Sequence, residues 1–121
     1  MDLRVADYHG QSYAEAADRE PLQMWDVNDV LSFCFEHGSS RLLLHSDNLP
    51  AGFFDLSTGV AGELLQKFRQ YRIQLAVVWT PAKVTHTARF AEMAAEENNG
   101  NHFHMSEDRD SATAWLVGDS T

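Results

Sequence analysis

Apolar and polar residues follow two different rhythms along this chain, and each rhythm predicts a different kind of element. Arg41–His45 and Ile73–Trp79 are nearly continuous apolar runs that end at turn-forming residues, a pattern typical of strands buried on both faces. Around them, apolar side chains recur every three or four positions, which predicts helices over about residues 26–37, 57–71 and 85–97. The stripes of the first two helices, which we expect to face the core, are Val27, Val30, Leu31, Cys34 and Phe35, and Val60, Leu64, Leu65, Phe68 and Tyr71.

The two ends of the chain carry shorter patterns. Leu3–Tyr8 and Ser12–Ala16 alternate weakly on either side of Gly10, which predicts a short hairpin that turns at this glycine. Near the other end, His102–Met105 is typical of a short strand, and we expect Ser106 to cap a last helix. The apolar residues of that helix are Ala112, Trp115 and Leu116.

Strand and helix alternate from Arg41 to the end of the chain, so parallel strands joined by helical crossovers are the natural topology. We therefore predict an α/β sandwich that begins with a hairpin and continues as a mostly parallel sheet. It should have about four or five strands and about four helices. No internal repeat, low-complexity stretch or long linker interrupts the chain, so residues 1–121 are expected to form a single domain.

Charge narrows the classes of partner. The 121 residues include 18 acidic and 9 basic side chains, for a net charge of -9. Nucleic-acid binding depends on clustered Lys and Arg, so neither nucleic acid nor an anionic membrane surface is expected as a partner. The absence of an apolar run of about 18 residues, an N-terminus without a signal-peptide core and the single Cys34 favour a cytoplasmic protein.

The segment between the first buried strand and the longest helix has the most distinctive composition. Asp55, Ser57 and Thr58 are good helix N-caps, and Gly59 and Gly62 keep the first turn bare enough for another backbone or a ligand to approach. Exposed N–H groups and the helix dipole favour an anion there, including a phosphate attached to Ser57 or Thr58. The alternative is a capped helix packed tightly on a sheet.

Two aromatic residues near this segment are candidates for a pocket or an interface. Trp79 ends a buried strand, where open α/β sheets usually bind ligands, and Phe54 lies just before the candidate turn. The simpler alternative for Trp79 is that its ring closes the core.

Other chemistry has weak support in the sequence. His45, His102 and His104 lie in or beside predicted strands and are conceivable zinc ligands, but scattered surface and partly buried histidines are the better interpretation. Cys34 is expected to be an inert core thiol. The sequence has no nucleophile elbow, no P-loop and no dinucleotide fingerprint. We therefore expect no enzyme activity, no metal and no cofactor.

The run Phe53–Phe68, preceded by Asn48–Pro50, closely resembles the signature of a bacterial family, the domain of unknown function numbered 4180 (DUF4180). The resemblance covers about the last two thirds of the chain, and Trp79–Thr80 departs from it, because the family more usually has a Gly-Asp pair there. The further matching positions are Tyr71, Leu75, Ala76, Val77, Val78, Phe90, Glu96, Asn98, Gly100, Ala114 and Leu116. The resemblance implies a fold class rather than an activity.

The segment Asp55–Gly59 also resembles the Asp-Ser-Ser/Thr-Gly turn of sulfate-transporter and anti-sigma-factor-antagonist (STAS) domains. Those domains begin with a hairpin and then alternate helix and strand. In the antagonists, the hydroxyl just before the glycine accepts phosphate from a partner kinase, which switches binding. The resemblance implies Thr58 as the corresponding position, although this chain has one extra residue between Asp55 and the hydroxyl pair.

Three functional classes follow from these observations. The first is a regulatory protein-interaction module that uses the turn Asp55–Gly62, with an unidentified protein partner and the option of a homodimer. The second is a small-molecule or anion binder that uses the same helix N-terminus. The third, least supported, is a small enzyme.

Overall fold

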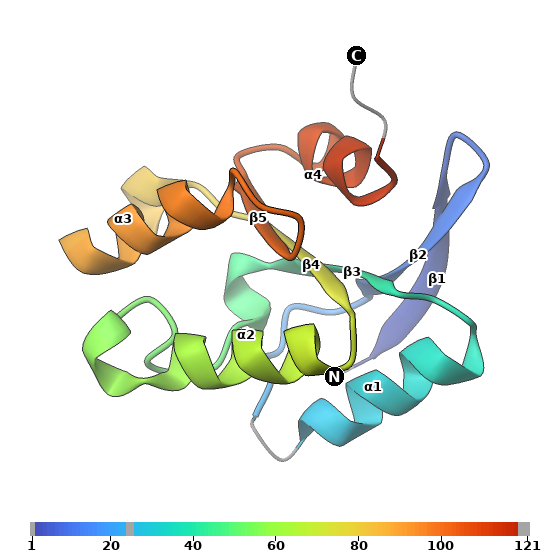
Figure 1. Cartoon of the computed structure of the whole chain (residues 1–121), viewed down its shortest axis with the longest axis horizontal. Helices are drawn as coiled ribbons and strands as arrows, with labels where there is room; N and C mark the ends of the chain where they lie inside the picture. Colours follow the sequence, from blue (N-terminus) through green and yellow to red (C-terminus); the bar gives the residue numbers. More distant parts are fainter. Residues whose placement is uncertain (1, 24–25, 119–121) are drawn as a thin grey trace.

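The computed structural model describes residues 2–23 and 26–118, which form one five-stranded sheet with four α-helices (Figure 1). Short 3-10 turns lie at Ser46–Asn48, Leu56–Thr58 and Pro81–Lys83. The elements, in chain order, are β1 (Leu3–Tyr8), β2 (Gln11–Ala16), α1 (Val27–Glu36), β3 (Arg41–His45), α2 (Val60–Gln70), β4 (Gln74–Val78), α3 (Ala88–Glu97), β5 (Phe103–Ser106) and α4 (Arg109–Leu116). None of the helices in these described ranges is both long and apolar enough to cross a bilayer.

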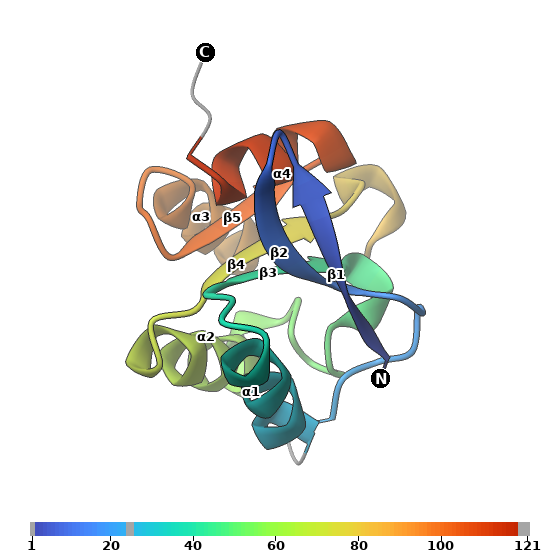
Figure 2. The same ribbon diagram turned by 90° about the vertical axis from the view of Figure 1, so that its right-hand side faces the viewer.

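The strands are arranged across the sheet in the order in which they occur along the chain, β1-β2-β3-β4-β5. Only the β1–β2 hairpin is antiparallel, and the remaining pairs are parallel. Because every crossover advances in the same direction, crossovers of one hand place α1, α2 and α3 on the same face. Helix α4 lies on the opposite face, as Figure 2 shows. The predicted α/β sandwich is confirmed.

The face that carries α1, α2 and α3 holds the larger core. Phe53, fully buried, lies at its centre and makes edge-to-face contacts with Phe90 and Phe103 at centroid distances of 5.6 and 6.2 Å. Leu42 and Leu75 point to this face from β3 and β4. These residues come from one helix, a loop and three strands, and they form one apolar layer.

The α4 face is much smaller. Its buried side chains are Tyr13, Leu43, Ala76, Ala112 and Leu116, with Trp115 packed beside them. Glu15 also points to this face, since it lies two residues after Tyr13 on β2, and it is only 2% exposed. A buried carboxylate therefore lies next to a small apolar cluster.

The predicted hairpin is confirmed. Tyr8 pairs with Gln11, and His9 and Gly10 between them both have positive φ, 52° and 83°. Positive φ at both central residues is the geometry that fits a two-residue hairpin turn.

Two predicted core residues are in fact exposed, so that part of the prediction is wrong. Phe35 is 57% exposed because it follows Cys34 by one residue, about 100° further round α1 and away from the buried stripe. Tyr71 is 40% exposed because α2 ends at Gln70, which leaves Tyr71 as its C-cap.

Three helix starts also differ from the prediction. Ser106 is the last residue of β5, and the side chain of Asp108 caps α4 by accepting a hydrogen bond from the Ser111 N–H at 2.7 Å. Helix α3 begins after Thr87, which accepts from the Phe90 N–H, rather than near Thr85. The third is α2, which starts within the candidate turn.

Candidate functional site

The candidate turn is a separate small structure and not the first turn of α2. Residues Leu56–Thr58 form a 3-10 turn capped by Asp55, whose Oδ1 accepts from the Ser57 N–H at 3.0 Å and the Ser57 hydroxyl at 2.7 Å. Gly59, with φ of 78°, ends this turn and precedes Val60, the first residue of α2. The helix therefore begins three residues later than predicted, because the left-handed glycine breaks the helical path.

Thr58 holds this loop together. Its hydroxyl lies within hydrogen-bond distance of two carbonyls to which it can donate, Gly52 at 2.7 Å and Asp55 at 2.8 Å, and it accepts from the Val60 N–H at 3.2 Å. Gly52 has a φ of 85°, and a Cβ at this position would lie 3.1 Å from Thr58 Oγ1. The close approach requires a glycine at position 52 and a hydroxyl at position 58.

Phe54 and Trp79, the two aromatic candidates, are brought together by the fold. Their rings are stacked at a centroid distance of 5.9 Å and an interplanar angle of 7°, and His86 meets the Trp79 ring edge-on at 5.1 Å. The Thr87 N–H donates to the carbonyl of Phe54 at 3.0 Å, which ties the loop after β4 to the loop after β3. Trp79 is itself buried, so it supports Phe54 from beneath.

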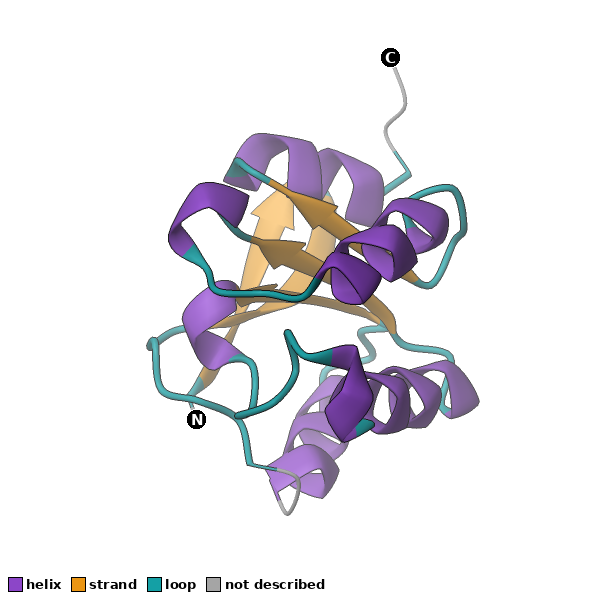
Figure 3. Cartoon of the chain, turned by 90° about the vertical axis from the view of Figure 1, so that its left-hand side faces the viewer, coloured by secondary structure: helices purple, strands orange, loops and turns teal. Residues whose placement is uncertain are grey.

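A groove of about 470 Å³ lies between the loop after β3 and the loop after β4. Figure 3 shows loops in teal. We call this groove the carboxyl-edge groove, because its walls belong to the loops that follow the carboxyl ends of β3 and β4. Ligands usually bind at this edge of a parallel sheet. Its lining residues are Ser46, Asp47, Leu49, Pro50, Ala51, Gly52, Phe54, Asp55, Thr85, His86 and Thr87.

The groove combines an apolar wall with negative charge. Leu49, Pro50 and Phe54 supply apolar surface, and two acidic residues, Asp47 and Asp55, line the same hollow. Such a site suits a ligand with an apolar part next to a cationic group. Of the predicted site residues, Phe54 and Asp55 line this groove, and Trp79 lies behind Phe54. Ser57, Thr58 and Gly59 belong to the adjoining turn, whereas Gly62 is exposed on α2 and does not line the groove.

Sequence reasoning missed a second polar cluster, which surrounds Glu15 on the α4 face. Arg109 donates to this carboxylate through Nε and Nη2 at 3.0 and 2.8 Å, and its Nη2 also donates to the Tyr13 hydroxyl at 2.7 Å. Arg4 adds a bond at 3.0 Å, and His45 Nε2 lies 3.4 Å from Glu15 Oε2. Two signals were present in the sequence: Tyr13 and Glu15 alternate onto one face, and Arg109 is the one base in the acidic segment 91–121.

The electrostatics of this cluster favour a structural role. Burial by itself would raise the pKa of Glu15, but hydrogen bonds from Arg109 and Arg4 outweigh it and lower the pKa to about 2. Burial raises the pKa of Tyr13 and, together with the nearby charge of Arg19, lowers that of His45. A carboxylate that is ionised at all ordinary pH values and already bound by two guanidinium groups is a tie between β2 and α4 and a poor general base.

The histidines and the cysteine lie apart from one another. His45 contacts Glu15, His104 stacks on Trp115 at 5.0 Å, and His102 is exposed just before β5. Within the described ranges, no three His, Cys, Asp or Glu side chains are grouped so that they could hold a metal ion. Cys34 is fully buried, and burial raises the pKa of its thiol to about 11.

The comparison with known proteins agrees with the resemblance at Phe53–Phe68 and extends it. No curated protein and no solved structure matches the chain. The family model described as "Domain of unknown function (DUF4180)" matches residues 9–116, a range that contains every strand from β2 onward and all four helices. This chain therefore belongs to the DUF4180 family.

Proposed function

We propose that this chain is a regulatory protein-interaction module of STAS-like type, which binds a partner segment in the carboxyl-edge groove beside the turn Asp55–Gly62. The observation that carries the proposal is the convergence of Phe54, Asp47 and Asp55 on one groove at the carboxyl edge of the sheet. The hairpin followed by alternating helix and strand, and the Asp55–Gly59 turn, support the STAS-like comparison.

The chemistry of the groove indicates the kind of partner. An apolar side chain packs against Phe54, and a neighbouring Lys or Arg meets Asp47 and Asp55. The net charge of -9 steers a basic segment toward the chain. An anion in the same groove meets two carboxylates, so the geometry favours a basic protein segment over a phosphorylated metabolite.

The turn supplies a means of regulation. Phosphate on Thr58 replaces the hydroxyl hydrogen that is donated to Gly52 and Asp55, and it adds negative charge close to the Asp55 carboxylate. Loss of these bonds frees the loop that carries Phe54. Phosphorylation is therefore a switch that opens the loop and ends partner binding.

Selection from a random peptide library tests the proposal. We expect the enriched peptides to carry Lys or Arg beside an apolar residue, and Asp47→Lys to weaken their binding about tenfold or more, which is about 1.4 kcal/mol. Asp29→Lys reverses the same charge on the exposed surface of α1 and serves as the matched control. Thr58→Glu should also lose binding while its circular dichroism spectrum stays native.

Two results would contradict the proposal. Enriched peptides without basic residues would remove the role of Asp47 and Asp55. Equal losses in Asp47→Lys and Asp29→Lys would show an effect of overall charge and not of the groove.

A further inference from the structure

Two exposed aromatic side chains lie together at the end of the molecule opposite the carboxyl-edge groove. Among the described residues, the exposed large apolar side chains are Val5, Phe35 and Tyr71. Phe35 and Tyr71 are in edge-to-face contact at 5.9 Å, at the carboxyl ends of α1 and α2. We call this pair the aromatic patch. Its two residues belong to apolar helical stripes, yet the core does not use them.

A small groove adjoins the aromatic patch. It has a volume of about 280 Å³ and is lined by Phe35 and Tyr71 together with Cys34, Ser39, Arg72 and Ile73, among others. Pockets for small molecules usually measure about 300–1,000 Å³, so this groove is closer to the size of one or two side chains. This surface therefore has both an exposed ring, Phe35, and a groove beside it.

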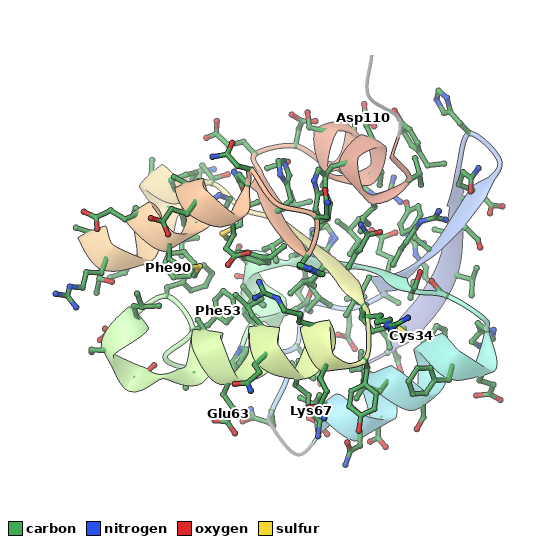
Figure 4. All side chains as sticks on the ribbon, viewed as in Figure 1. Cys34, Phe53, Glu63, Lys67, Phe90 and Asp110 are labelled. Atoms are coloured by element: carbon green, nitrogen blue, oxygen red, sulfur yellow. The ribbon has the colours of Figure 1, made fainter. Side chains whose placement is uncertain are left out.

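The surface around the aromatic patch carries both acidic and basic side chains, so its charges complement those of a second copy. Glu36 follows Phe35 on α1, while Lys67 and Arg72 flank Tyr71, with Lys67 Nζ 5.6 Å from the centre of the Tyr71 ring. Figure 4 shows Cys34 on α1 and Lys67 on α2, the two helices that form this surface. The patch thus has an acidic side on one helix and a basic side on the other.

We propose that the aromatic patch is a homodimer interface, in which Phe35 of each copy enters the small groove of the other about a two-fold axis. A two-fold interface requires that one surface contain both the projecting group and the hollow that receives it. The same axis brings Glu36 of one copy to Lys67 and Arg72 of the second copy, and the reverse.

The net negative charge of the chain favours self-association through this face over other faces. Two chains that each carry a net charge of -9 repel one another over most approaches. Lys67 and Arg72 place two of the nine basic residues beside this patch, while Arg69 pairs with Glu97 of α3 at 3.2 Å. Two copies can therefore approach at this end with the least repulsion.

The dimer leaves both carboxyl-edge grooves free. The small groove includes Ser39, Ser40 and Ile73, which lie just before the amino ends of β3 and β4. Because β3 and β4 are parallel, their amino and carboxyl ends lie at opposite edges of the sheet. The two carboxyl-edge grooves of a dimer consequently face outward.

Sedimentation velocity over a range of protein concentrations tests this interface. The wild type is expected to shift from a mass of 13.6 kDa toward twice that value as concentration rises, and Phe35→Ser to stay at 13.6 kDa. Val5→Ser is the matched control, since Val5 is 47% exposed on β1, away from the patch, and this variant should associate like the wild type. Tyr71→Ser gives an independent result if Phe35→Ser alters the circular dichroism spectrum.

A charge exchange tests the two-fold arrangement. Glu36→Lys should weaken the dimer although it reduces the net negative charge, and adding Lys67→Glu to it should restore association. A wild type that remains at 13.6 kDa at every concentration, or a Phe35→Ser variant that dimerises normally, would overturn the proposal. Mass is the readout, so failure here leaves the carboxyl-edge groove untouched.

Discussion

The two faces of the sheet are stabilised in different ways. On one face, three helices bury a continuous apolar layer centred on Phe53, and no charged side chain among the described residues is buried in it. On the other, the eight-residue α4 covers a small apolar cluster and is tied to the sheet through the buried Glu15 carboxylate. The stabilisation from apolar burial is proportional to the buried area and does not depend on direction. An Arg–carboxylate pair with two hydrogen bonds, in contrast, fixes one relative geometry of the two groups.

Helix α4 is fixed to the sheet at each end by a specific contact. Arg109, the first residue of α4, binds Glu15, and Trp115, near the end of α4, stacks on His104 with an interplanar angle of 15°. A short helix that buries few side chains has several ways to lie on a sheet. These two contacts select one of them.

The largest effect is expected in the larger core. Phe53→Ala removes a fully buried ring in contact with Phe54, Phe90 and Phe103, and should lower the free energy of unfolding by about 4 kcal/mol. Urea denaturation at neutral pH measures this. Val5→Ala, at an exposed position on β1, should change it by less than about 0.5 kcal/mol. Similar losses in both variants would remove the argument that Phe53 is the centre of the layer.

The next largest effect is expected at Glu15, and its pH dependence distinguishes the Glu15–Arg109 pair from the apolar layer. The pKa of Glu15 is lowered from 4.5 to about 2, so the stabilisation from this carboxylate is fully present above about pH 4.5 and is lost as pH falls toward 2. Glu15→Gln should cost about 3 kcal/mol at neutral pH, and the difference from the wild type should vanish near pH 2.

Urea denaturation of both proteins over this pH range provides the measurement. Glu92→Gln is the control, because it makes the same substitution at an exposed carboxylate within α3, away from Arg109. A difference between wild type and Glu15→Gln that stays constant from neutral pH to pH 2 would mean that lost packing, and not lost charge, causes the destabilisation.

A matched pair of leucines compares the faces with identical chemistry. Leu64 on α2 and Leu116 on α4 are both fully buried, one in each core. Leu64→Ala should cost about 2 kcal/mol more than Leu116→Ala, since α4 can settle into the space while the larger core cannot. Equal costs would show that the α4 cluster is as rigid as the larger core.

The smallest effect concerns access rather than stability. Cys34 belongs to the larger core, and its thiol has a pKa of about 11, so almost no thiolate exists near pH 8. Iodoacetamide should label Cys34 far more slowly in native buffer than in urea. Rapid labelling of the native protein would reveal that α1 opens locally and that the larger core is less secure than its packing indicates.

Patterns in consecutive residues predicted the fold well. The apolar runs at Arg41–His45 and Ile73–Trp79 became parallel neighbours, because a strand covered on both faces needs side chains that tolerate burial in either direction. The hairpin followed from weak alternation around Gly10. The positions of the helix starts were less accurate: Ser106 and Asp108 are both good caps, and the choice between them depends on Ser106 pairing with Val78 in the sheet.

The site was only partly predictable for the same reason. Phe54, Trp79 and Asp55 were identified as candidates, but their meeting depends on two loops that approach each other through the Thr87–Phe54 hydrogen bond. Glu15 and Arg109 are 94 residues apart, and no local pattern connects a strand residue with a helix residue at that separation. Likewise, the apolar spacing along a helix does not show which of its residues the rest of the protein covers. Phe35, which lies at apolar spacing yet is exposed, is an example.

The order of the strands in the sheet has a consequence for synthesis on the ribosome. Each strand from β2 to β5 pairs with the one made immediately before it, so no strand must be inserted between two that are already joined. The sheet can therefore lengthen as the chain emerges, and each crossover helix is complete before its next strand arrives. Glu15 is made early and Arg109 late, so the α4 face remains open until the rest of the sheet has formed.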